Sequence, residues 1–309
     1  MGQQLWAVDS LGGFLGSDVL SKQIRHRSQT TQRFRQFTNP EPAMGKNVGD
    51  TVLFDKISNI STSGGTLSET STIPKNNYTI TQGSLVVAEW GNSLPYTLKS
   101  KVLAEVSVPD NIKTVLRNDM SVVLDSAAAA QFQTSDLFAI CVNTATTSFD
   151  SSGAVSSTAT ADMSDKNVRD VIDDMKKKNI PLWDGENYIC IASTNSVRGL
   201  YDFFEAKAQN TTMGPLFRGE VGQYYKTRFI EETNALINTA GSDALFGEAV
   251  FFGADSVREG IVIPENIRID LPKDYGRDQG IAWYAMLNFV KTWDFSADGE
   301  GHIIYMTSA

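Results

Sequence analysis

Residues 49–92 form a strand-rich segment that cannot bury itself. Its two arms, residues 49–57 and 78–91, are rich in β-branched and aromatic residues that partly alternate with polar ones, which predicts two strands. The tip between them, residues 58–77, is rich in Ser, Thr, Gly and Asn. Because an isolated two-stranded ribbon is only marginally stable in water, this ribbon needs a surface to rest on. A second copy of the chain is the natural candidate, so we expect assembly rather than catalysis.

The predicted ribbon also carries apolar side chains that need cover. We expect Val52, Phe54, Ile80 and Val86 to be exposed on it, together with an unpaired backbone edge. Contacts with a neighbouring subunit would cover both features.

Composition allows one large domain or two of medium size. The 309 residues are 41% hydrophobic and 20% charged, which is ordinary for a globular protein. No apolar run approaches about 18 residues and the first residues lack a signal-peptide pattern, so we expect the chain to stay in the cytoplasm after synthesis. Cys141 and Cys190 are then expected to be buried free thiols.

The first forty residues contain a basic segment in a chain whose formal net charge is −9. No acid occurs between residues 19 and 40, and the basic residues there are Lys22, Arg25, Arg27, Arg33 and Arg35. A basic arm on an acidic body favours a partner, either nucleic acid or the acidic face of another subunit, although a solvated terminus is the alternative. We expect the arm to become ordered only in an assembly.

Two aromatic residues interleave with the arginines of this arm. Phe34 and Phe37 flank Arg35, a pattern loosely typical of segments that stack on nucleic-acid bases. An arm that inserts both rings into a neighbouring subunit is the other reading, and it is the one we favour.

The clearest helix covers residues 109–132. Pro109 and Asp110 are helix-start signals, and apolar residues then recur with helical spacing. These residues are Ile112, Val115, Leu116, Met120, Val123, Leu124, Ala127 and Ala130. A rod of roughly 36 Å follows from about 24 residues at 1.5 Å each, which suits a spine laid across a sheet.

Later residues alternate strand and helix, which is typical of an α/β subdomain. Strands are expected at 137–142, 188–192 and 224–233, with helices at 165–178 and from 194 or 195 onward, and a loop at 143–160. Short strands at 249–252 and 268–270, a long central strand at 281–293 and a final strand at 302–306 complete the chain.

No pattern in the sequence indicates a catalytic, cofactor-binding or metal site. His26 and His302 are far apart, and no Cys/His cluster has the spacing of metal ligands. Neither a nucleophile elbow nor a phosphate-binding loop is present. Neighbouring acids such as Asp173 and Asp174 are read as a solvated face, so we expect no enzyme and no cofactor.

The order of these parts resembles the major capsid protein of tailed bacteriophages, and most closely the podovirus-type coat proteins. The residues that carry the resemblance are Val48–Val52, Gly65–Glu69, Ile73–Pro74, Glu89–Asn92, Tyr188–Ser193 and Gly219–Gly222. Each motif is weak by itself, and their order along most of the chain carries the likeness.

The resemblance implies an α+β protein with the capsid architecture called the Johnson fold. Residues 1–48 would be an N-terminal arm and 49–92 the extended β-ribbon loop. A peripheral domain would combine the spine helix, in 93–135, with the late strands of 246–309. Residues 136–245 would be the α/β axial domain.

The resemblance further implies a structural protein whose pentamers and hexamers build an icosahedral shell around double-stranded DNA, first in the host cytoplasm and then in the virion. Portal, scaffolding and decoration or cement proteins are possible partners, and no membrane is involved. The arm contacts would come from Lys22, Arg25, Arg27, Arg33, Phe34, Arg35 and Phe37. The extended-loop contacts would come from Val52, Phe54, Leu67, Glu69, Ile73, Lys75 and Ile80. The alternatives are a cellular encapsulin-type nanocompartment shell, which shares the fold, and a soluble α/β enzyme with a deep polar pocket.

Overall fold

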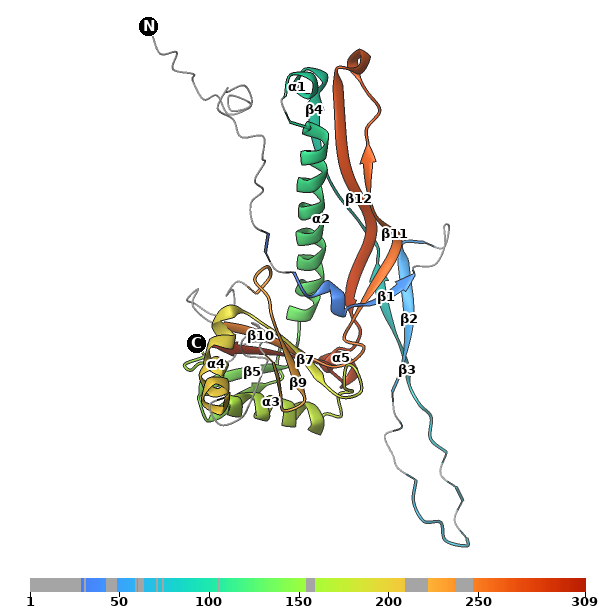
Figure 1. The fold of residues 1–309 in the computed structure, drawn as a ribbon. Helices are drawn as coiled ribbons and strands as arrows, with labels where there is room; N and C mark the ends of the chain where they lie inside the picture. Colours follow the sequence, from blue (N-terminus) through green and yellow to red (C-terminus); the bar gives the residue numbers. More distant parts are fainter. Residues whose placement is uncertain are drawn as a thin grey trace. The chain divides into compact units, whose positions relative to one another are not determined.

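The computed structural model of the 309-residue chain describes residues 29–30, 32–42, 49–58, 60, 64–70, 72–73, 75–104, 106–153, 159–208, 222–236 and 247–309. Its helices and main strands follow one another as drawn in Figure 1. They are β1 (Asn39–Pro42), β2 (Thr51–Ile57), β3 (Ile80–Val86), β4 (Ala88–Thr97), α1 (Leu98–Leu103), α2 (Val108–Gln133), β5 (Phe138–Asn143), β6 (Thr146–Asp150), α3 (Asp165–Lys177), β7 (Tyr188–Ala192), α4 (Thr194–Ala208), β8 (Gln223–Tyr224), β9 (Thr227–Glu231), β10 (Gly247–Phe252), β11 (Val257–Ile269), β12 (Asp278–Lys291), α5 (Phe295–Asp298) and β13 (Ile303–Ser308).

The described residues belong to two compact units. Unit 1 includes Glu89–Val123 and Ile263–Met286. Unit 2 takes in the described residues of Thr31–Ala88, together with those of Leu124–Val262 and Leu287–Ala309. Helices and sheets are mixed in this chain, which confirms the α+β class.

In unit 1, one carboxylate ties the spine helix α2 to two strands. Asp119 on α2 accepts hydrogen bonds from Trp283 Nε1 on β12 at 2.8 Å and from Asn92 Nδ2 on β4 at 3.0 Å. The Trp283 side chain is buried, so its N–H needs such an acceptor. Gly91 faces Trp283 across the sheet, where a Cβ would lie 2.8 Å from the tryptophan carbonyl oxygen. Only glycine therefore allows this close approach of β4 to β12.

Unit 2 is built on a seven-stranded sheet with the order β6-β5-β13-β10-β7-β9-β8. β13 pairs in parallel with β5 and antiparallel with β10, and β7 pairs in parallel with β9. All five residues of β7 and all six residues of β10 and of β13 are buried, as central strands covered on both faces require.

Helix α3 confirms the expected amphipathic helix. Ser164 caps its start by accepting the N–H of Asn167, whose side chain reaches back to the Ser164 backbone. The apolar stripe of Val168, Val171, Ile172 and Met175 is fully buried in the core of unit 2. Burial of each such side chain stabilises the fold by about 1.5–3 kcal/mol.

Several boundaries differ from the sequence expectations. The sequence predicted no helix or strand between the ribbon and the spine helix, but β4 continues to Thr97 and α1 follows it. A hairpin partner, β6, lies inside the expected loop 143–160 and pairs antiparallel with β5. β6 contains Thr and Ser residues, which are common in loops, but threonine is also common in strands. The late strand around 268–270 is the end of the much longer β11.

The pairing of the late strands does not follow the expected division into a peripheral and an axial domain. The resemblance implied a peripheral domain that combines residues 246–309 with the spine helix. Strands β10 and β13 instead complete the seven-stranded sheet, beside β5 and β7, which lie within 136–245. The strand that runs through 281–293 does occupy an interior position, because β12 lies between β11 and β4 in a four-stranded sheet with the order β1-β11-β12-β4.

Two smaller expectations have clear outcomes. Cys141 and Cys190 are free and buried, as expected. Burial raises the pKa of the Cys141 thiol to about 12, so it is not a reactive thiolate at neutral pH. None of the described helices is both long and apolar enough to cross a bilayer.

Candidate assembly interface

The extended ribbon consists of β2 and β3, which run antiparallel as a two-stranded sheet of their own (Figure 1). Alternate residues face opposite sides of this ribbon. One side carries the cross-strand pairs Thr51/Val86, Leu53/Ser84, Asp55/Gln82 and Ile57/Ile80. Its apolar members, Leu53, Ile57, Ile80 and Val86, are each more than half exposed. The ribbon therefore presents an apolar stripe that the described residues leave more than half exposed, as expected for Ile80 and Val86.

The other side of the ribbon is packed within unit 2. Phe54 is buried, so the expectation that it is exposed is wrong, and Val52 is half-buried. The partner of Phe54 in the register is Gly83, and a Cβ on Gly83 would lie 2.2 Å from the Phe54 ring. A glycine opposite an aromatic residue is the sequence signal that could have predicted this burial. The Arg258 guanidinium lies 4.9 Å from the centre of the Phe54 ring, on the ring face.

Two ion pairs fasten the root of the ribbon. Lys56 on β2 pairs with Asp298 on α5, and both side chains are nearly buried. Arg258, which stacks on the ribbon, also pairs with Glu41 on β1 and with Asp255. The root of the ribbon is thus fixed to unit 2, while its exposed stripe stays available.

The described part of the N-terminal arm docks on its own chain. Phe34 is fully buried, with its ring 5.4 Å from that of Phe132 on α2. Phe37 makes edge contacts with Trp183 at 5.6 Å and with Phe252 at 5.5 Å. We favoured the interpretation that both rings insert into a protein surface, and they do. The expectation that this surface belongs to a neighbouring subunit is wrong, because both rings pack against residues of the same chain.

Charge pairing holds the same segment. Arg35 Nη2 donates to Glu259 Oε1 at 2.8 Å, and Thr38 Oγ1 donates to Glu259 Oε2 at 2.9 Å. The Arg35 backbone N–H donates to Asp125 at 3.0 Å. Burial raises the pKa of Asp125, and this hydrogen bond and one from Asn234 offset part of the rise. Arg35 thus finds carboxylates, as expected of the arm, but they belong to the same chain.

The remaining expected contact residues fall into two groups. Lys22, Arg25 and Arg27 lie outside the described residues. Arg33 in the arm is exposed, as are Leu67, Glu69, Ile73 and Lys75 in the ribbon tip. Their contacts with a neighbouring subunit or with DNA stay predictions.

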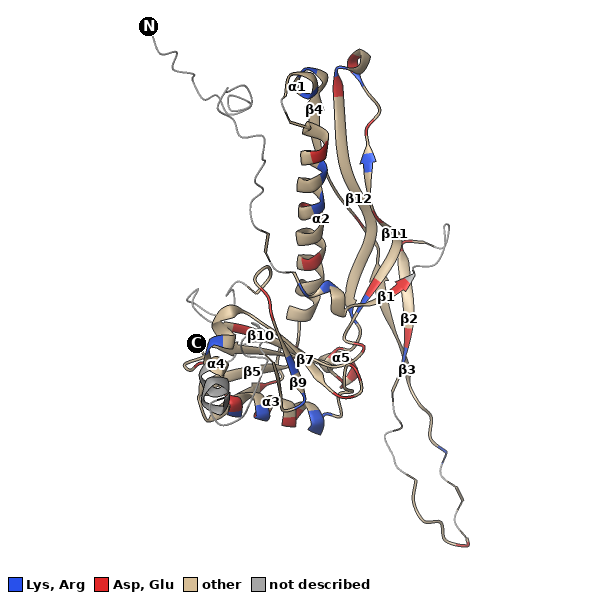
Figure 2. Cartoon of the chain, viewed as in Figure 1, with Lys and Arg blue, Asp and Glu red and all other residues tan. Residues whose placement is uncertain are grey.

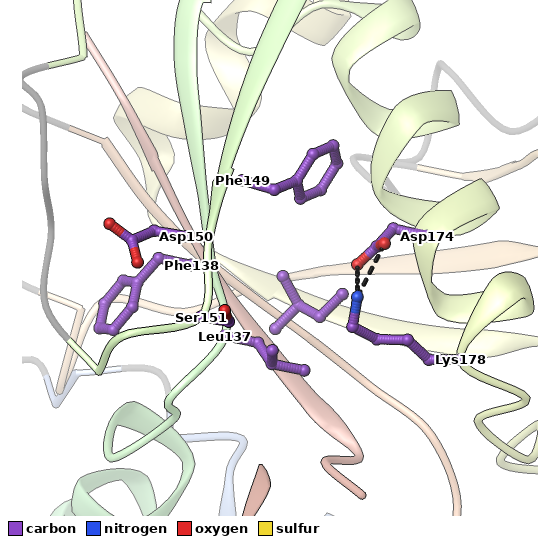
Figure 3. Close-up of a pocket in the computed structure, with 8 residues that line it drawn as sticks. Leu137, Phe138, Phe149, Asp150, Ser151, Asp174 and Lys178 are labelled. Carbon is purple, nitrogen blue, oxygen red and sulfur yellow. Dashed lines mark hydrogen bonds and ion pairs between the residues drawn. The ribbon is translucent and has the colours of Figure 1, made fainter. Parts of the chain in front are cut away.

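An enzyme site would need a deep pocket with converging polar groups. One hollow, of about 110 Å³, is lined by Leu137, Phe138, Phe149, Asp150, Ser151, Asp174, Lys178 and Ile304 (Figure 3). Its Lys178 Nζ is paired with both oxygens of Asp174 at 2.8 Å. Within the described part of the chain, no three His, Cys, Asp or Glu side chains are grouped to hold a metal ion. The hollow is far below the usual 300–1,000 Å³ of a ligand site.

A second hollow, in unit 1, was not expected from the sequence. This α1 groove has a volume of about 730 Å³ and is lined by Thr97, Leu98, Lys99, Val102, Leu103, Asp274, Arg277 and Asp278. Leu98, Val102 and Leu103 recur at helical spacing, but such a pattern cannot tell an inward face from an outward one. The groove offers neither a histidine nor a cysteine, and its Arg277 lies 3.5 Å from Asp274.

Comparison with known proteins gives a match in structure but none in sequence. No protein-family model and no curated protein matches the chain. The capsid of Ralstonia phage GP4 is similar with a TM-score of 0.67 and 13% identity, over 97% of this chain and 97% of that one. The capsid of cyanophage Pam1 is similar with a TM-score of 0.66 and 14% identity, over 98% of this chain and 99% of that one.

A third similar structure is the acidic stable capsid of Helicobacter pylori bacteriophage KHP30, with a TM-score of 0.63 and 13% identity. It matches over 100% of this chain and 99% of the other. The likeness therefore runs from end to end and is not limited to one unit. The chain has the fold of these bacteriophage capsid proteins, which confirms the Johnson fold expected from the sequence.

Proposed function

We propose that this chain is a structural capsid subunit that assembles with copies of itself into a closed shell. The observation that carries the proposal is the ribbon of β2 and β3, whose root is fixed within unit 2 while four apolar side chains on its other face stay more than half exposed. A monomer rarely keeps such a stripe uncovered, because apolar surface is stabilised by removal from water. The end-to-end likeness to phage capsid structures supports the same function.

The finer proposal is a shell of pentamers and hexamers with icosahedral symmetry around double-stranded DNA. The subunit would reside in the host cytoplasm before assembly and in the virion capsid afterwards, with no enzymatic role and no cofactor. Portal, scaffolding and decoration or cement proteins would be its partners. The basic residues Lys22, Arg25, Arg27 and Arg33 would face the enclosed DNA or an acidic neighbour.

A test begins with electron microscopy and light scattering of the purified full-length chain. Rings or shells are the expected particles, with subunit contacts well above the area of crystal packing. A monodisperse monomer at every protein and salt concentration would refute the proposal. The nucleic acid of shells isolated from the producing cells separates a phage capsid from a nanocompartment, which would hold an enzyme cargo instead.

A matched pair of variants tests the ribbon itself. Ile57→Lys places a charge in the exposed stripe, beside Ile80, without touching the packed face. The variant should fold like the parent but form at least tenfold fewer shells. Ile57→Val keeps the stripe apolar and should assemble normally. If Ile57→Lys assembles as well as Ile57→Val, the stripe is not an assembly contact.

A further inference from the structure

Helix α1, the end of β11 and the turn between β11 and β12 expose six large apolar side chains of unit 1. They are Leu98, Val102, Leu103, Ile269, Leu271 and Tyr275. Leu271 is 81% exposed, and the exposure of Tyr275 reaches 105%. Three of the six, Leu98, Val102 and Leu103, line one groove beside the turn, which favours an interaction site there, since scattered single residues would need no explanation.

The backbone of the turn is held in an unusual conformation that keeps Tyr275 in solvent. Asp274, Tyr275 and Gly276 have successive φ angles of 48°, 52° and 88°. Left-handed angles are uncommon for non-glycine residues and cost energy that the surrounding structure must offset. Hydrogen bonds from the N–H of Lys273 to Asp278 O and from the N–H of Gly276 to Lys273 O, both 3.0 Å, close the turn. Backbone strain at a fully exposed aromatic residue points to a role for that residue.

Helix α1 also lacks cover. It has only six residues and buries none of them, although isolated helices of this length are unstable in water. A capping box between Thr97 and Ser100 supports its start, and the Leu98 N–H donates to Arg277 O at 2.9 Å. Its apolar residues Val102 and Leu103 are 71% and 70% exposed, so most of their apolar surface would stabilise the protein only once another surface covers it.

The α1 groove is large enough to receive an aromatic side chain. Leu98, Val102 and Leu103 form its apolar wall, and Asp274, Arg277 and Asp278 form its charged rim. Its volume of about 730 Å³ lies within the usual range of ligand pockets. Tyr275 is adjacent in sequence to Asp274 on the rim, but its complete exposure means that it does not fill the groove of its own chain.

The charges of the turn favour a second copy as the occupant. Lys273 pairs with Asp270 at 2.9 Å and Arg277 with Asp274 at 3.5 Å, and all four side chains are at least half exposed. With Asp278, the turn thus carries two cations and three carboxylates, so both signs are present in a chain whose net charge is −9 (Figure 2). Such a surface complements itself, because each exposed cation can pair with a carboxylate of the next copy.

We infer that Tyr275 of one copy inserts into the α1 groove of a neighbouring copy, with the ions of the turn pairing across the contact. The inference rests on the proposed shell function and adds a second contact to that of the ribbon. Tyr275 and the α1 groove are different patches on the surface of the same chain, so the contact is head-to-tail. Such contacts close into a ring when the rotation between neighbouring copies allows it. Tyrosine is a common anchor of such interfaces, because its ring is apolar and its hydroxyl remains hydrogen-bonded.

Cross-linking between two full-length variants tests the contact directly. Tyr275→Cys chains are mixed with Val102→Cys chains and assembled, then oxidised mildly. The native Cys141 and Cys190 are buried and do not compete. The disulfide between the two variants should form at least tenfold more than in a mixture of Tyr275→Cys with Lys177→Cys, whose cysteine replaces an exposed residue of α3. Equal yields in the two mixtures would overturn the inference.

The Tyr275→Gly variant separates assembly from folding. Glycine adopts the left-handed conformation without strain, so the melting temperature of the subunit should stay the same or rise. Shell yield should nevertheless fall at least tenfold, whereas Tyr275→Phe, which keeps the ring, should assemble close to the parent level. Loss of stability in Tyr275→Gly, or normal shells from it, would contradict the inference.

The outcomes distinguish this inference from the shell function. Normal shells from Tyr275→Gly without the specific disulfide would leave the capsid function intact and reject the tyrosine contact. Failure of the parent chain to form rings or shells under every condition would reject the shell function, and with it the tyrosine contact.

Discussion

The close contact between Gly83 and Phe54 makes the root of the ribbon sensitive to a single methyl group. In Gly83→Ala, the new Cβ would lie 2.2 and 2.3 Å from two carbons of the Phe54 ring. Carbon atoms are in favourable contact at about 3.5–4.0 Å, so ring or strand must shift by more than about 1 Å. The ring has little freedom, because Arg258 lies on its face and is itself paired with Glu41.

The expected cost follows from this geometry. Overpacking of a buried site typically destabilises by about 1–3 kcal/mol. The cost should be local, because β2 and β3 form a separate two-stranded sheet and can open without the seven-stranded sheet. A loss of this size corresponds to amide exchange that is about 5-fold to 150-fold faster in the ribbon.

Hydrogen exchange followed by mass spectrometry measures this change in peptides that cover β2 and β3. Gly65→Ala is the matched control, because it lies in the ribbon tip and a Cβ there meets nothing within 4 Å. The double variant Gly83→Ala with Phe54→Leu should lose less protection than the sum of the two single variants, because the smaller side chain relieves the clash. Exchange in Gly83→Ala that equals that of the parent and of Gly65→Ala would refute the packing argument.

Two further predictions concern the interior of unit 2. Phe34→Ala should lower the free energy of unfolding by up to about 3–5 kcal/mol, because the ring is fully buried against Phe132. Arg33→Ala is the control: Arg33 is exposed, so the free energy of unfolding should change by less than about 0.5 kcal/mol. Equal effects of the two substitutions in denaturant titrations would contradict the docking of the arm. His302 Nδ1–H donates to Ala254 O at 2.7 Å, and burial lowers the pKa of this histidine below the ordinary 6.5. The unfolded chain then binds more protons, so this histidine removes stability as the pH falls through 6.5, and His302→Asn should reduce that loss in thermal melts between pH 7 and 5; an unchanged pH dependence would contradict the assignment.

The sequence predicted those parts of the fold whose pattern is strong and local. The helix over 109–132 appears as α2 at Val108–Gln133, and strand 188–192 matches β7 in full. Both depend on periodicity and on capping or boundary residues, which neighbouring residues supply. The order of arm, ribbon, spine and α/β region then led to the Johnson fold, which the structural likeness confirms.

The direction in which side chains face could not be predicted in the same way. Phe34 and Phe37 indicate that the arm packs against a protein surface, but an apolar residue does not specify whether that surface belongs to the same copy of the chain or to another. The pattern of Leu98 and Val102 is that of an ordinary amphipathic helix, although α1 turns these residues outward. Exposure depends on long-range topology, and periodicity carries no information on that.

The arm and the ribbon meet at three consecutive residues of β11. Glu259 accepts from Arg35 of the arm, while the residues on either side of it face the ribbon. Arg258 stacks on Phe54, and a Cβ on Gly260 would lie 2.8 Å from Leu85 of β3. Successive side chains of a strand point to opposite faces, so this part of β11 holds Arg35 on one face and the ribbon on the other, and Arg258 on the ribbon face also pairs with Glu41 of the arm. A rotation or register shift of β11 would therefore move the anchors of both segments at once. Because these first residues of β11 are packed on both faces, the two segments that we propose for assembly are positioned together within unit 2 before any second copy arrives.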